Sequence, residues 1–165
     1  MIEAYHGSSH QILKFSTEFV GEGHDQEGPG IYFTSDMQDA ATYGRYIHKV
    51  LLEIKSSVGL KRKAKRSEIK QMILWCEDMD DKLMDWDENP KVAMETAIKS
   101  CLLQDNEHQS FLSVWYDFYR YRPVDYVQNM VKLGYDAVVV PRNTHTGVRH
   151  YIVLDPRVIF AQSIM

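Results

Sequence analysis

Runs of apolar residues alternate with amphipathic segments along the chain, and their order predicts how it folds. Six short runs rich in Val, Ile, Leu and aromatic residues predict strands, and they cover residues 2–6, 31–33, 46–54, 137–140, 151–154 and 158–161. Between the third and fourth runs, apolar positions recur at helical spacing, which predicts helices at residues 67–75, 90–103 and 124–133. Strands at both ends of the chain with helices in the middle predict a single α+β domain.

The segment 28–43 carries the densest set of structural signals in the chain. Glycines on either side of a proline break the chain before a strand, and Asp36 or Ser35 is a good N-cap for the helix predicted after it. A strand that passes directly into a helix places Tyr32 and Tyr43 where they can flank a flat ligand. From spacing alone, half-buried core positions are the more common explanation for two such tyrosines.

The first predicted strand ends in three residues that can serve a site, His6, Gly7 and Ser8. A glycine lets the backbone turn sharply or approach a ligand closely, and a serine offers a hydroxyl. A lone histidine in such a place is more often structural. The polar segment 16–30, with four glycines and three glutamates, is long for a loop, which indicates that it is either mobile or wrapped over a ligand.

Two charged runs and one aromatic run lie in the middle of the chain, and each has two interpretations. The basic run 61–66 and the acidic stretch 77–88 are either solvated helix ends that partly neutralise each other or, for the basic run, a grip on a phosphate-bearing target. The aromatic residues of 108–122, with Arg120 and Arg122 among them, more often form the packed face of a helix, although such a mixture also stacks nucleobases.

Composition indicates a folded, soluble protein. The 165 residues are 44% hydrophobic and 25% charged, and the net charge of −4 gives no general attraction to nucleic acid. Cys76 and Cys101 have no metal-type spacing, which favours reduced core thiols in a cytoplasmic protein. The N-terminus lacks the pattern of a signal peptide, and no segment has the roughly 18 apolar residues of a membrane span, so we expect no membrane association.

Three separated motifs resemble, in order and in spacing, the three signature strands of the ADP-ribosyltransferases. They are residues 5–8 (Tyr-His-Gly-Ser), residues 30–35 (Gly-Ile-Tyr-Phe-Thr-Ser) followed by Ala41 and Tyr43, and residues 151–156 (Tyr-Ile-Val-Leu-Asp-Pro). The similar branch is the one with a His-Tyr-Glu triad, which includes the poly(ADP-ribose) polymerases and the diphtheria-type toxins. The resemblance implies a split β-sheet core.

Two further segments narrow the resemblance. The glycine-rich loop and the stretch 132–137 look like those of the small bacterial and phage members, which are found as toxins or inside phage polyvalent proteins. The resemblance covers about residues 2–58 and 124–161. Residues 60–123 match nothing and are expected to be a helical insert within one domain of residues 1–165.

The resemblance implies that the protein uses NAD as its substrate and requires no metal. His6 would hydrogen-bond a ribose hydroxyl, and Gly7 would pair through its backbone with the nicotinamide carboxamide. Tyr32 and Tyr43 would sandwich the nicotinamide ring. The loop 21–30 would close over the dinucleotide. The expected NAD-binding residues are His6, Gly7, Ser8, Gly30, Tyr32, Thr34 and Tyr43.

The third triad position departs from the family pattern, because His150 stands where the family has a glutamate. That glutamate accepts a hydrogen bond from the 2′-hydroxyl of the nicotinamide ribose and offsets developing positive charge, whereas a neutral imidazole accepts the bond without a charge. The expected catalytic residues are therefore His6, Tyr32 and His150. Three outcomes are open: His150 supports a transferase limited to mono-ADP-ribosylation, a carboxylate from elsewhere takes the role, or the protein binds NAD without turnover. The candidate carboxylates are Glu22, Glu27 and Glu53.

The resemblance leaves the acceptor open between a protein and a nucleic acid. The loop 143–149 would face the target, and it lacks the paired acidic residues of arginine-modifying toxins. His145, Arg149 and the basic run 61–66 would suit a nucleic acid. The expected role is that of a toxin or phage-related effector, which would also give the protein an antitoxin or inhibitor protein as a partner.

Overall fold

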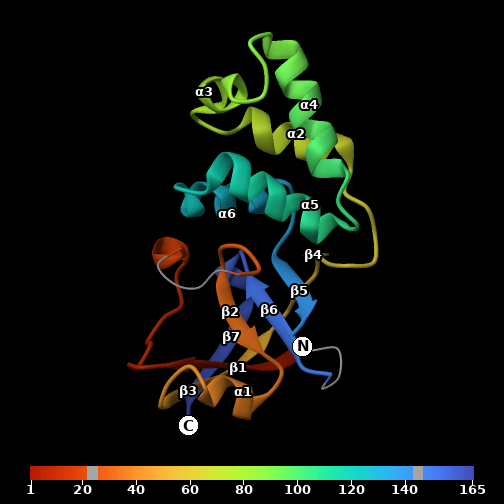
Figure 1. The fold of residues 1–165 in the computed structure, drawn as a ribbon. Helices are drawn as coiled ribbons and strands as arrows, with labels where there is room; N and C mark the ends of the chain where they lie inside the picture. The colour runs from red at the N-terminus through yellow and green to blue at the C-terminus, as the bar shows by residue number, and fades with distance from the viewer. Residues whose placement is uncertain (22–25, 143–146) are drawn as a thin grey trace.

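The protein has one lobe built on a β-sheet and one built of helices, as the computed structural model in Figure 1 shows; the structure describes residues 1–21, 26–142 and 147–165. Within these residues, seven strands form one sheet in the order β4-β5-β6-β2-β1-β3-β7. The strands are β1 (Ile2–Ser8), β2 (Ile31–Thr34), β3 (Tyr46–Leu52), β4 (Ser57–Val58), β5 (Ala137–Pro141), β6 (Arg149–Val153) and β7 (Ile159–Ile164). The expected α+β class with a helical middle is confirmed.

The helices lie mainly between β4 and β5 in the chain and form the upper lobe of Figure 1. The short helix α1 (Met37–Ala41) lies apart from them, beside β1 and β3. The remaining α-helices are α2 (Arg66–Leu74), α3 (Met79–Met84), α4 (Pro90–Leu102), α5 (Glu107–Val114) and α6 (Pro123–Lys132). Shorter turns are the 3-10 helices η1 (Thr17–Phe19) and η3 (Pro156–Val158) and the π-helical segment η2 (Trp115–Tyr119). Within the described residues, no helix combines the length and apolarity needed to cross a membrane.

The sheet is nearly split between β1 and β2. Strands β1 and β3 pair antiparallel along their full length, from Ile2 opposite Leu52 to Ser8 opposite Tyr46. In contrast, the register of β1 with β2 consists of one pair, Tyr5 opposite Thr34, in the part of the chain that the structure describes. The sheet therefore consists of two halves, β4-β5-β6-β2 and β1-β3-β7, that diverge on either side of this pair, as the resemblance implied.

Two apolar cores lie on opposite faces of the first half of the sheet. Because side chains alternate along a strand, Ile152 of β6 faces the helical core while its neighbours Tyr151 and Val153 face the second core. The helical core takes in residues of α2, α4, α5 and α6. The second core is centred on Phe15 and Phe33, whose rings meet edge to face with centroids 5.0 Å apart. Phe15 comes from a segment without regular secondary structure.

Most predicted elements are present, and the misses have local causes. Asp36 is the N-cap of α1, as expected. The start of α2 was predicted at Ser67, but Lys65 holds the N-cap position and makes no side-chain cap bond. The helix α3 was missed because its stretch is mostly acidic and buries Leu83 alone among its six residues. Strand β4 was missed because two residues are too few for a period to be recognised.

The aromatic run of the middle segment packs in the core, and the basic run makes polar contacts within the chain. The Arg62 guanidinium lies 2.7 Å from the Glu107 carboxylate, and Lys63 donates to the backbone carbonyl of Gln104. The basic run is thus tied to the helices around it rather than to the acidic stretch. The aromatics Phe111, Phe118 and Tyr119 are buried, which confirms core packing, and both cysteines, Cys76 and Cys101, are free and buried, as predicted.

Candidate functional site

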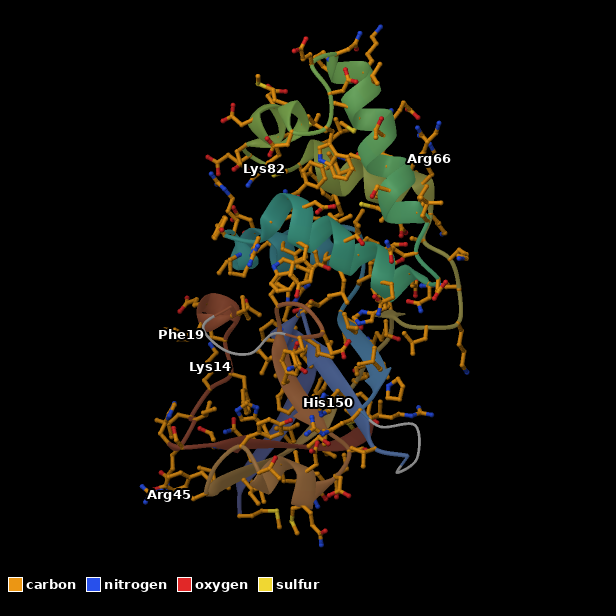
Figure 2. The ribbon with its side chains drawn as sticks, viewed as in Figure 1. Lys14, Phe19, Arg45, Arg66, Lys82 and His150 are labelled. Atoms are coloured by element: carbon orange, nitrogen blue, oxygen red, sulfur yellow. The ribbon has the colours of Figure 1, made fainter. Side chains whose placement is uncertain are left out.

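A large pocket opens where the two halves of the sheet diverge. It has a volume of about 1290 Å³, and its walls come from β1, β2, α1, the segment 10–20 and the ends of β5 and β6. Figure 2 marks Lys14 and Phe19 on the segment 10–20 and His150 in the sheet lobe, and all three line the pocket. Six of the seven expected NAD-binding residues also line it, namely His6, Gly7, Gly30, Tyr32, Thr34 and Tyr43.

His6 is held in one tautomer. Its Nδ1 lies 2.7 Å from the backbone carbonyl oxygen of Tyr32, and because a carbonyl only accepts, Nδ1 carries the hydrogen. Its ring packs edge-on against Phe15 with centroids 5.2 Å apart. Burial lowers the pKa of His6, so the imidazole is neutral near pH 7. Nε2 of the neutral ring is therefore a hydrogen-bond acceptor, which suits a hydroxyl group of a ligand.

The glycines of the site are required by close packing. A Cβ atom on Gly7 would lie 1.8 Å from the backbone oxygen of Ala40 in α1, and one on Gly30 would lie 2.3 Å from Cγ2 of Ile152. Strand β1 and helix α1 therefore approach each other more closely than any side chain allows. Ser8 does not line the pocket; its hydroxyl donates to the carbonyl of His10 at 2.6 Å.

Tyr32 and Tyr43 border the pocket from β2 and from the turn after α1. The Tyr32 hydroxyl donates to the Gly28 carbonyl at 2.7 Å and accepts from the Glu27 amide at 3.0 Å, which fixes the ring. Tyr43 is 53% exposed, so the expectation from spacing that it is a core residue is wrong. The guanidinium of Arg142 lies over its ring, 5.5 Å from the centroid.

His150 lies beside Tyr32 and is buried. In the sheet it stands opposite Thr34 of β2, and the rings of His150 and Tyr32 meet edge-on with centroids 6.2 Å apart. Its Nε2 is 3.2 Å from Oδ2 of Asp39. The same Asp39 carboxylate holds Arg142, whose Nε is 2.7 Å from Oδ1. The residue at the glutamate position is thus part of a His-Asp-Arg cluster at the edge of the pocket.

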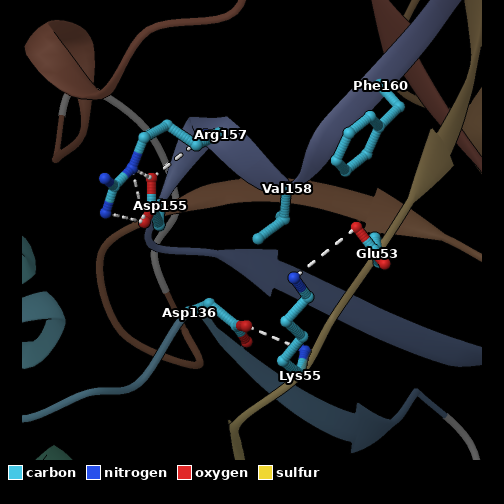
Figure 3. Close-up of a pocket in the computed structure, with 7 residues that line it drawn as sticks. All are labelled: Glu53, Lys55, Asp136, Asp155, Arg157, Val158 and Phe160. Carbon is cyan, nitrogen blue, oxygen red and sulfur yellow. Dashed lines mark hydrogen bonds and ion pairs between the residues drawn. The ribbon is translucent and has the colours of Figure 1, made fainter.

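The carboxylates proposed as replacements for the glutamate are placed differently from one another. Glu27 lines the pocket, but its Oε2 lies 2.7 Å from Nε2 of the buried His108 in α5, which points it toward the helical lobe. Glu53 lines a separate pocket, where it faces Lys55 as Figure 3 shows. Glu22 lies outside the described residues.

Two residues of the site were missed from the sequence, Asp39 and Arg142. Asp39 lies in the first turn of α1, three residues after the N-cap, where an acidic side chain is common because it interacts favourably with the helix dipole. Because the helix dipole is a sufficient reason for an acid there, the sequence does not indicate that Asp39 contacts His150, 111 positions away. Arg142 directly follows β5 and had no motif to mark it.

Comparisons with known proteins identify a family for this chain. A search of curated proteins finds no match. One solved structure, described as the crystal structure of an anti-CRISPR protein, is 12% identical, with 99% of this chain and 95% of that chain covered and a TM-score of 0.43, a likeness too small to carry an argument. The family model of the ADP-ribosyltransferase in polyvalent proteins matches residues 1–160, including the helical segment that resembled nothing. The chain therefore belongs to the ADP-ribosyltransferases of polyvalent proteins.

Proposed function

We propose that the protein is a mono-ADP-ribosyltransferase that moves one ADP-ribose unit from NAD to a macromolecular acceptor. The observation that carries the proposal is the convergence of His6, Tyr32, Tyr43 and His150 on one pocket, in a chain of the ADP-ribosyltransferase family. The volume of about 1290 Å³ exceeds the roughly 300–1,000 Å³ of ordinary small-molecule sites, which suits a dinucleotide.

In this proposal, the pocket holds the nicotinamide half of NAD by shape and by hydrogen bonds. Nε2 of neutral His6 accepts a ribose hydroxyl, and the backbone of Gly7 pairs with the carboxamide. Tyr32 forms a fixed wall because its hydroxyl donates to the Gly28 carbonyl and accepts from the Glu27 amide. Tyr43 forms the opposite wall, and since it is half-exposed before binding, it gains the most burial when the ring stacks on it.

The reaction then breaks the bond between N1 of nicotinamide and C1′ of the ribose. The bonding electron pair leaves with nicotinamide, which becomes neutral, and positive charge spreads over C1′ and the ring oxygen. A nucleophile of the acceptor bonds to C1′ and loses its proton. Catalysis consists of holding the leaving group still and stabilising the positive charge, and His150 supports it by accepting a hydrogen bond from the 2′-hydroxyl. Transfer of single units is proposed because the family members that elongate chains generally use the glutamate that His150 replaces.

The experiment is incubation of the purified protein with NAD labelled in the adenylate phosphate and a bacterial extract. Free nicotinamide is measured, and the products are divided between protease and nuclease treatment. We expect nicotinamide release and a label that one of the two treatments removes, which identifies the acceptor class. If no macromolecule is labelled and no nicotinamide is released, the proposal that the protein is an enzyme is overturned. Binding of NAD without release of nicotinamide identifies a catalytically silent binding module instead.

A matched pair of tyrosine variants makes the result specific. Tyr32→Ala removes the fixed wall of the pocket and is expected to abolish transfer. Tyr121→Ala alters a tyrosine that is 82% exposed after η2 and does not line the pocket, so it is expected to retain full activity. Expression of the protein and of Tyr32→Ala in growing bacteria tests the toxin role, which predicts growth arrest by the wild type alone.

A further inference from the structure

The third triad position holds His150 and no carboxylate, but the carboxylate of Asp39 contacts the His150 ring. Asp39 is 12% exposed, and its Oδ2 lies 3.2 Å from Nε2 of His150, whose side chain is 11% exposed. The register of β6 with β2 fixes His150 opposite Thr34, and the N-cap bonds of Asp36 fix the first turn of α1, which carries Asp39. The pair is therefore held by two rigid elements rather than by a loop.

The Asp39 carboxylate determines which ring nitrogen of His150 carries the hydrogen. A carboxylate only accepts, so Nε2 of His150 carries a hydrogen, and in the neutral form of an imidazole the lone pair is then on Nδ1. Nδ1 can then accept a hydrogen bond from a hydroxyl, as the family glutamate does. Without a partner at Nε2, the imidazole would be divided between two tautomers, one of which has no acceptor at Nδ1.

Asp39 also carries the negative charge that His150 lacks. Arg142 pairs with the other carboxylate oxygen at 2.7 Å, but its side chain is 39% exposed, whereas that of Asp39 is 12% exposed. Solvent and salt screen the more exposed charge of Arg142 more strongly than that of Asp39, and Oδ2 of Asp39 is the atom that contacts His150. A positive charge that develops on a ribose next to His150 would therefore be stabilised across the imidazole.

We propose that Asp39 is a positioning residue for the transfer reaction: it selects the tautomer of His150 and supplies the negative charge that a glutamate would provide at that position. The inference rests on the proposed function, since it assigns a role in NAD cleavage. The reaction itself is unchanged, and His150 keeps its Nε2 hydrogen throughout.

A purely structural role for Asp39 makes different predictions. Asp39 links α1 to the ends of β5 and β6 through Arg142 and His150. If Asp39 served only as this structural link, its loss would lower the stability of the fold and would reduce activity by a similar factor whatever residue stands at position 150. Loss of a charge that substitutes for a glutamate matters only while no glutamate is present.

The test is a double-variant cycle on the full chain, with Asp39→Asn, His150→Glu and their combination. Nicotinamide release gives kcat and KM, and thermal unfolding monitors the fold.

Asp39→Asn keeps an oxygen that can accept from Nε2 of His150 but removes the negative charge. We expect kcat to fall on the order of a hundredfold, with KM changed less than about threefold. In the His150→Glu background, the same change is expected to leave kcat unchanged or to raise it, because it removes a like charge beside the new glutamate. Asp81→Asn, an exposed acid in the first turn of α3, is the control and keeps full activity.

Each outcome decides. An unchanged kcat in Asp39→Asn, or an equal loss in both backgrounds with lowered thermal stability, overturns the inference but leaves the proposed function intact. A wild-type protein that releases no nicotinamide overturns the proposed function, and this inference with it. A selective loss in the His150 background that His150→Glu rescues supports the inference.

Discussion

Replacing Gly7 with alanine tests whether the close contact between β1 and α1 shapes the pocket. The added Cβ would lie 1.8 Å from the Ala40 oxygen and 2.8 Å from its carbonyl carbon, and both atoms are backbone. Cβ atoms essentially never approach other atoms within 3.0 Å, so the two elements must separate by about 1.2 Å or more. Helix α1 carries Asp39, the partner of His150, and leads into Tyr43, which lines the pocket, so this shift moves both residues at once.

The structural shift sets the size of the expected effects. A misplacement of about 1 Å in a catalytic site costs on the order of a hundredfold in rate, and overpacking of this kind costs about 1–3 kcal/mol of stability. We therefore expect Gly7→Ala to fold, with nicotinamide release reduced about a hundredfold. The assays are nicotinamide release at saturating NAD, NAD binding by calorimetry and unfolding in urea.

Gly59→Ala is the matched control for this substitution. A Cβ on Gly59 would meet the Val139 oxygen at 3.8 Å, an ordinary contact, and its backbone bond to Glu107 is kept. This variant should keep both activity and stability. If Gly7→Ala matches Gly59→Ala in activity while fully folded, the contact with α1 does not shape a working site and the reasoning is wrong.

Three further predictions follow from individual side chains. Tyr43→Ala should weaken NAD binding about 3- to 10-fold, measured by calorimetry, with stability unchanged because the ring is exposed. His108→Leu removes the hydrogen-bond partner that Glu27 has at 2.7 Å, so urea unfolding should show a loss of about 1–3 kcal/mol in the free energy of unfolding, and an unchanged midpoint would contradict a role for this pair. Burial lowers the pKa of His6 and of His48 from 6.5, so the unfolded chain binds more protons than the folded chain just below that pH. The free energy of unfolding in urea should therefore fall as the pH drops from 7.5 to 5.5. The fall should be smaller in His6→Gln.

The sheet and most of the pocket could be predicted because their signals are local. Strand runs such as residues 151–154 show their period directly, and the C′ glycine Gly134, at φ of +101°, ends α6 where expected. Gly7 and Gly30 could be predicted for a similar reason. Each stands in a short sequence motif, and at each position the surrounding atoms leave room for no residue but glycine. The motifs also assigned His6 and Tyr32 to one site, and both residues line the same pocket.

The side-chain partners of the site could not be predicted, because they depend on contacts between distant segments. The bond between Glu27 and His108 spans 81 positions and joins the segment before β2 to a helix of the middle segment. It also shows why the middle segment belongs to the site: α5 holds Glu27, and the Glu27 backbone holds the Tyr32 hydroxyl. A resemblance restricted to the strands treats these helices as an insert, whereas the family model includes them.

The exchange of glutamate for His150 has a different meaning once Asp39 is considered. From the sequence, a histidine at this position removes a charge, and an enzyme that loses a preorganised charge loses rate. In the arrangement proposed above, Asp39 supplies that charge, because its carboxylate is 12% exposed and contacts the imidazole. Under this proposal, histidine and aspartate together perform both tasks of a glutamate, since the imidazole accepts a hydrogen bond and the carboxylate opposes positive charge. It follows that a relative with this histidine and no acid at the position of Asp39 should cleave NAD on the order of a hundredfold more slowly, and restoring the aspartate there should restore the rate.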